Sequence, residues 1–136
     1  MTVIKGIRIA VRAALSALLI GMGVNHFRPK QAHVMAKMIP PRMRREGILS
    51  PDHLVAFTGA CEIAGGIGIQ LPQTRRLAGG ALVAFFVAVF PANAHAAANP
   101  DTFKQLATPF WPRLGAQVAL LAVTVFAASG RSRAMR

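Results

Sequence analysis

The sequence predicts an all-α membrane protein, a four-helix bundle with antiparallel, up-down spans. Four apolar stretches, each about 20 residues long, are separated by short polar or basic connections, and that length matches the hydrocarbon core of a bilayer. Of the 136 residues, 54% are hydrophobic and only 15% are charged, with a mean hydropathy of +0.45. Soluble domains carry about 25% charged residues. The length suits a single transmembrane domain over residues 1–136, with spans at about 7–27, 51–71, 77–98 and 109–129 and an interfacial connection over 28–50.

The net charge of +12 does not indicate nucleic-acid binding. The basic residues lie in the connections and at helix ends, where they anchor a span against lipid headgroups. Cys61 is the single cysteine, which excludes an internal disulfide, a dithiol redox motif and a metal site built on several thiolates.

The first span closes in Asn25, His26 and Arg28. A basic start before an apolar run also describes a secretory signal peptide, but no small-x-small cleavage site follows, so we expect the segment to stay in the protein. In the connection, Pro29 can open a short helix lying in the interface.

The second span has a clear start signal. Ser50 is expected as N-cap, Pro51 in the first helical position and Asp52 at the positive end of the helix dipole. The span stops at Pro72, and 19 residues from His53 to Leu71 rise about 28 Å, enough to cross.

The tight basic turn at 73–76 predicts that the second and third spans pack as an antiparallel hairpin. Within the third span, Pro91 frees a backbone carbonyl that needs a partner. Residues 100–107 are expected to form a short surface helix, and Thr108 and Pro109 open the fourth span.

The distribution of basic residues does not distinguish the two possible orientations of the bundle. An even number of spans puts both termini on one side, and eight basic residues then fall on each side: Lys5, Arg8, Arg12, Arg75, Arg76, Arg131, Arg133 and Arg136 against Arg28, Lys30, Lys37, Arg42, Arg44, Arg45, Lys104 and Arg113. The tendency of the first helix to dominate places the termini in the cytoplasm.

All four spans contribute polar residues to the half of the membrane opposite the termini, which predicts a polar cavity there. The candidate ligand or proton site comprises Glu62, His26, Asn93, Arg113 and Gln117, with Asn25 and His95 as secondary members. Catalytic residues cannot be assigned, because no Ser-His-Asp arrangement or phosphate loop is present. No metal site is predicted, because the His and Glu residues lack a recognised ligand spacing.

Glu62 is the strongest candidate for a functional residue, because placing a charged side chain near the bilayer centre costs about 2.5–3.5 kcal/mol on translocon scales. It should pair with a cation, with His26, Arg113 and His95 available, or carry a proton. The alternative is a Glu that only holds helices together. Likewise the two histidines can be interfacial anchors, and Asn93 can satisfy the backbone opened by Pro91.

Several motifs resemble the DoxX and DoxX-like membrane proteins. They are Gly-x-x-His-Phe at 23–27, Met-Ile-Pro-Pro at 38–41, Thr-Gly-x-x-Glu-Ile-x-Gly-Gly-x-Gly at 58–68, Pro-x-Thr-Arg-Arg-Leu-Ala at 72–78 and Val-Phe-Pro-Ala-Asn at 89–93. The resemblance covers roughly residues 20–98. The basic stretch 42–46 departs from it, because this connection is usually more apolar in such proteins.

The resemblance implies a four-helix inner-membrane bundle linked to quinone-dependent electron transfer, since the name-giving member is a membrane subunit of a thiosulfate:quinone oxidoreductase. His26, Glu62 and Asn93 match motif positions of the family. We therefore expect a non-catalytic accessory subunit that presents a polar site to a quinone or docks a membrane-associated redox enzyme. The alternatives are a small proton-coupled transporter and a purely structural assembly factor. Besides the lipid bilayer and such an enzyme, a second copy in a homo-oligomer is a candidate partner.

Overall fold

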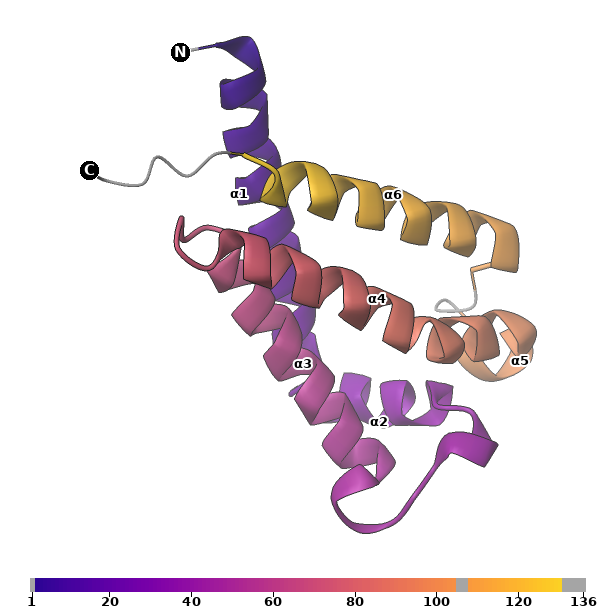
Figure 1. Ribbon diagram of the computed structural model, residues 1–136. Helices are drawn as coiled ribbons and strands as arrows, with labels where there is room; N and C mark the ends of the chain where they lie inside the picture. Colours follow the sequence, from indigo (N-terminus) through magenta and orange to yellow (C-terminus); the bar gives the residue numbers. More distant parts are fainter. Residues whose placement is uncertain (1, 105–107, 131–136) are drawn as a thin grey trace.

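The computed structural model describes residues 2–104 and 108–130, and every regular element in these ranges is helical (Figure 1). The long helices are α1 (Val3–Asn25), α3 (Pro51–Gly68), α4 (Arg75–Ala98) and α6 (Phe110–Ala128). Shorter elements are α2 (Pro29–Met38), the 3-10 turns η1 (Pro41–Met43) and η2 (Gly47–Leu49), and α5 (Pro100–Phe103).

Three of these helices, α1, α4 and α6, are long and apolar enough to cross a membrane. Their outer surfaces carry large exposed apolar side chains, among them Leu77, Val87 and Val125, and an apolar patch of this kind is stable only against lipid or another protein. By contrast, α3 does not reach that hydropathy, because Asp52, His53 and Glu62 lie within its 18 residues.

The helix bounds follow the apolar stretches with shifts of a few residues. The first helix begins at Val3 rather than near residue 7, and α4 begins at Arg75 rather than 77. The second expected span was predicted to reach Leu71, but α3 ends at Gly68. The Thr74 hydroxyl donates to the Gly68 carbonyl at 2.7 Å and so closes the helix end.

Two further predictions, one of a helix cap and one of a helix length, also differ from the structure. Ser50 stands at the N-cap of α3, with Pro51 and Asp52 as predicted, but its hydroxyl makes no cap bond to the backbone and lies 2.7 Å from His53 Nδ1. The expected helix over 100–107 is the single turn α5; it stops before Lys104, whose φ is 46°, and 105–107 lie outside the described residues.

The long helices pack as two antiparallel pairs, α1 with α3 and α4 with α6 (Figure 1). The pairs meet at one end, where α1 contacts α6 and α3 contacts α4. The apolar core lies at this end, and its buried members are Leu15, Leu19, Ile69, Leu82, Phe86 and Ala127. Toward the other end the pairs spread apart, and α2 lies there against both α3 and α4 (Figure 1).

The interface between α1 and α3 is a close-packed seam in which glycines lie between larger side chains. Buried positions recur at alternating spacings of four and three, as in a coiled coil: Arg12, Ser16, Leu19 and Gly23 on α1, and Val55, Gly59, Glu62 and Gly66 on α3. A Cβ built on Gly23 would lie 2.7 Å from the Gly59 carbonyl oxygen. The two backbones are therefore in contact at Gly23 and Gly59, and this contact places the C-terminal end of α1 beside Glu62.

Candidate functional site

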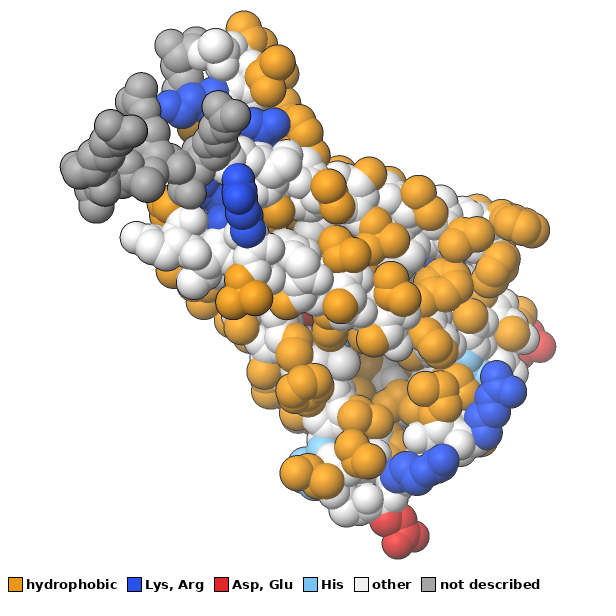
Figure 2. All heavy atoms as spheres, in the orientation of Figure 1, with side chains coloured by type: hydrophobic (Ala, Val, Ile, Leu, Met, Phe, Trp, Pro, Cys, Tyr) orange, Lys and Arg blue, Asp and Glu red, His pale blue; other side chains and the backbone are white. Residues whose placement is uncertain are grey.

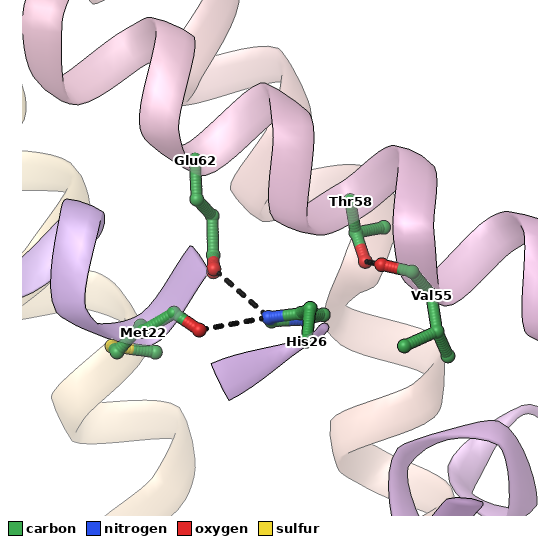
Figure 3. Close-up of polar contacts among 5 residues, drawn as sticks. All are labelled: Met22, His26, Val55, Thr58 and Glu62. Atoms are coloured by element: carbon green, nitrogen blue, oxygen red, sulfur yellow. Dashed lines mark hydrogen bonds and ion pairs between the residues drawn. The ribbon is translucent and has the colours of Figure 1, made fainter. Parts of the chain in front are cut away.

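Glu62 is the acidic side chain enclosed by the seam, and it is 5% exposed. Its Oε2 atom lies 3.3 Å from Nδ1 of His26, which follows the last residue of α1 (Figure 3). Because Gly59 has no side chain, His26 can approach α3 closely: a Cβ at Gly59 would lie 2.5 Å from the His26 Cβ. The glycine seam thus positions the imidazole beside the carboxyl group.

The hydrogen bond of His26 to the backbone shows which ring nitrogen carries a hydrogen. Nδ1 lies 2.9 Å from the Met22 carbonyl oxygen, which can only accept, so Nδ1 carries a hydrogen and donates it there (Figure 3). The Glu62 Oε2 atom faces the same nitrogen but receives no hydrogen bond within the described part of the chain. Thr58, one turn away on α3, donates its hydroxyl to Val55 and not to this pair.

Other buried polar groups of the seam are well satisfied. Ser16 Oγ donates to the Gly66 carbonyl at 2.6 Å, and Gln70 Nε2 donates to Ser16 Oγ at 2.7 Å. Arg12, 9% exposed, donates from Nε to the Ala127 carbonyl at 2.9 Å and ties α1 to the end of α6. These bonds fasten helices together. A buried carboxylate oxygen that lacks such a bond needs a different explanation.

A second polar cluster lies between α4 and α6. Arg113 Nη1 donates to Asn93 Oδ1 at 2.9 Å, and Gln117 Nε2 donates to the Phe86 carbonyl at 2.6 Å. Asn93 is thus used to bind Arg113. Pro91 has no N–H and so leaves the Val87 carbonyl without its helical donor; Gln117 bonds instead to the neighbouring carbonyl, that of Phe86.

The polar side chains that were predicted to share one cavity therefore form two separate clusters. Glu62 pairs with His26 between α1 and α3, whereas Asn93, Arg113 and Gln117 join α4 to α6. The sequence places all of them in one half of the molecule, but the two helix pairs diverge in that half and α2 lies between α3 and α4. The position of a residue along its helix can be predicted from the sequence. Which residues of other helices it contacts depends on how the two helix pairs diverge.

The secondary candidates lie elsewhere. His95 Nδ1 is 3.3 Å from the Asn99 side-chain nitrogen, and its ring packs edge-on to Phe103. Asn25 is the last residue of α1, and the described part of the chain shows no hydrogen bond of its side chain. In the same part of the chain no three His, Cys, Asp or Glu side chains group as a metal site would require.

The Glu62–His26 pair places a carboxyl oxygen, which receives no hydrogen bond from the described residues, 3.3 Å from an imidazole nitrogen. Such a pair can bind a hydroxyl or carbonyl group and pass a proton to or from it. The sequence identified both residues, but not the Met22 carbonyl that fixes the imidazole.

A family model described as a domain of unknown function (DUF8561) matches residues 15–128. Neither the curated proteins nor the solved structures yielded a match. The matched segment runs from the middle of α1 to the end of α6 and includes both polar clusters. Since this is most of the chain, the protein belongs to the DUF8561 family.

Proposed function

We propose that the protein is a four-span bundle of the inner membrane, with α3 as the fourth span and both termini in the cytoplasm, related to the DoxX proteins. At 18 residues, α3 rises about 27 Å, close to the hydrocarbon thickness. Glu62 lies on the buried face of α3 and is 5% exposed, so it does not face lipid tails, whereas Asp52 and His53 are exposed in the first turn, at the end of the helix. A helix sheltered in this way can cross with lower hydropathy than its neighbours.

Within this bundle, we propose that Glu62 and His26 form an intramembrane site for a quinone headgroup, in an accessory subunit of a redox system. The observation that carries the proposal is the buried Glu62 oxygen that receives no hydrogen bond in the described chain. Glu62 accepts a hydrogen bond from a quinol hydroxyl, or donates one to a quinone carbonyl when protonated. His26 Nδ1 lies 3.3 Å from the same carboxyl oxygen.

The choice of a quinone rests on two arguments. A ligand that reaches a carboxyl group between apolar helices must itself dissolve in the membrane, and a quinone does so while presenting two polar oxygens. The second argument is the resemblance to DoxX proteins over residues 20–98, which includes both His26 and Glu62.

The packing disfavours the transporter alternative. A transported proton or solute needs access from both sides, but the buried Leu15, Leu19, Ile69, Leu82, Phe86 and Ala127 close the end where the helix pairs meet.

The proposal is tested by titrating decylubiquinone into the purified protein in dodecyl maltoside and following thermal unfolding by circular dichroism. We expect the quinone to raise the unfolding midpoint of the wild type and of Ser16→Ala, which removes a polar group of the same seam without touching the pair. Glu62→Gln should lose that response while its own midpoint stays near that of the wild type.

A quinone response retained in Glu62→Gln would reject the site. If Glu62→Gln and His26→Gln both fail to fold, the pair is a structural element, and the assembly-factor alternative is favoured instead. A conservative amide keeps the volume of the carboxyl group, so folding itself should survive the change.

A further inference from the structure

A cavity of about 430 Å³ lies between the start of η1 and the second half of α4. Its walls are largely apolar and rigid, because Pro40, Pro41, Pro91 and Ala94 form them. The two polar lining residues are Arg42 and His95, and no lining residue is acidic. The proposed quinone site shares none of these residues.

Arg42 differs from its neighbours in the basic stretch. Arg44 donates to the Ile39 and Lys37 carbonyls, and Arg45 donates to the Arg42 and Arg44 carbonyls, so both side chains hold the turn after α2. Within the described ranges the Arg42 guanidinium donates to no protein group. It remains available for an external anion.

The second polar residue, His95, has a defined tautomer. The Asn99 side-chain nitrogen donates to the His95 carbonyl at 2.8 Å, which fixes the orientation of that amide. The same nitrogen faces His95 Nδ1 at 3.3 Å, so Nδ1 is the acceptor and the ring hydrogen resides on Nε2. A neutral His95 therefore still offers one N–H donor, beside a permanent Arg42 cation.

The position of the cavity matches the headgroup layer of a membrane. His95 lies three residues before the end of α4, about 5 Å of helical rise from its end. Lys and Arg side chains gather beside apolar surface at the end of the molecule that holds α2 and α5 (Figure 2). In the proposed topology this is the non-cytoplasmic end, and a basic pocket beside apolar helices at this level can hold an anionic lipid headgroup through charge-assisted hydrogen bonds.

We propose that this cavity binds the phosphate of an anionic phospholipid, with Arg42 and His95 Nε2–H as donors and the proline walls against the glycerol and upper acyl chain. The anion and the apolar walls together favour a lipid over free phosphate, which has no apolar part to place against the prolines.

The test is native mass spectrometry of the delipidated protein titrated with phosphatidylglycerol or phosphatidylcholine. We expect one phosphatidylglycerol to bind in preference, about tenfold weaker binding in Arg42→Gln, and several-fold weaker binding in His95→Phe, which keeps an aromatic ring against Phe103. Lys37→Gln is the matched control: it removes the same charge from an exposed α2 position outside the cavity and should change binding less than twofold.

Equal weakening by Arg42→Gln and Lys37→Gln would overturn the proposal, because only general charge would then matter. Equal affinity for the two lipids would overturn it as well. Displacement of phosphatidylglycerol by millimolar inorganic phosphate would show that the site takes a free anion and not a lipid.

Discussion

Replacing Gly23 by alanine tests the seam that positions His26 against Glu62. The new Cβ would lie 2.7 Å from both the Gly59 carbonyl oxygen and the Ile63 Cγ1 atom. The Gly59 oxygen belongs to the backbone and cannot rotate away as a side chain can, so α1 and α3 must move apart. Overpacking of this kind costs about 1–3 kcal/mol.

Gly21→Ala is the matched control on the same helix, because a Cβ there meets nothing within 4 Å. Both substitutions gain the helix propensity of alanine, about 0.5–1 kcal/mol, since both lie inside α1. The clash is present only at Gly23. The two variants should therefore differ in unfolding free energy by about 1–3 kcal/mol, with Gly21→Ala the more stable.

The assay is reversible unfolding in mixed micelles of dodecyl maltoside and SDS, followed by circular dichroism. Gly23→Ala should unfold at lower SDS than the wild type, whereas Gly21→Ala should unfold at the same SDS or higher. Equal stability of the two alanine variants would refute the close approach of α1 and α3, and with it the argument that glycines place the imidazole.

Two further predictions concern the hydrogen bonds between helices. Ser16→Ala removes the donor to the Gly66 carbonyl and should lower the unfolding free energy by about 0.6–1.7 kcal/mol in the same assay; an unchanged value would mean that the bond does not form. Gln117→Leu leaves the Phe86 carbonyl without its side-chain donor and should destabilise the α4–α6 pair by a similar amount, about 0.6–1.7 kcal/mol; a stabilised variant would contradict the assigned bond.

Much of the secondary structure was predictable, because apolar runs and proline positions determine it locally. Pro29 and Pro51 occupy the first positions of α2 and α3, as expected. Helix ends were less predictable, since side chains from beyond the helix close them. Thr74 donates to the carbonyl of Gly68, the last residue of α3, and no residue within α3 itself predicts that bond.

The candidate site was predictable only in part. The cost of an acid among apolar residues singled out Glu62, and the structure places His26 beside it. Arg113 was an equally good cation by sequence, yet its described hydrogen bonds are to Asn93 and Thr108. The choice between the two partners depends on which helices pair, and that is set by the glycine contacts of the folded seam.

The central claim, that the Glu62 carboxyl group binds a ligand directly, is tested most directly by infrared difference spectroscopy on adding quinone to the protein in lipid. We predict a shift in a carboxyl or carboxylate stretching band that disappears in Glu62→Gln. A spectrum in which quinone binds with no change in those bands would contradict the claim.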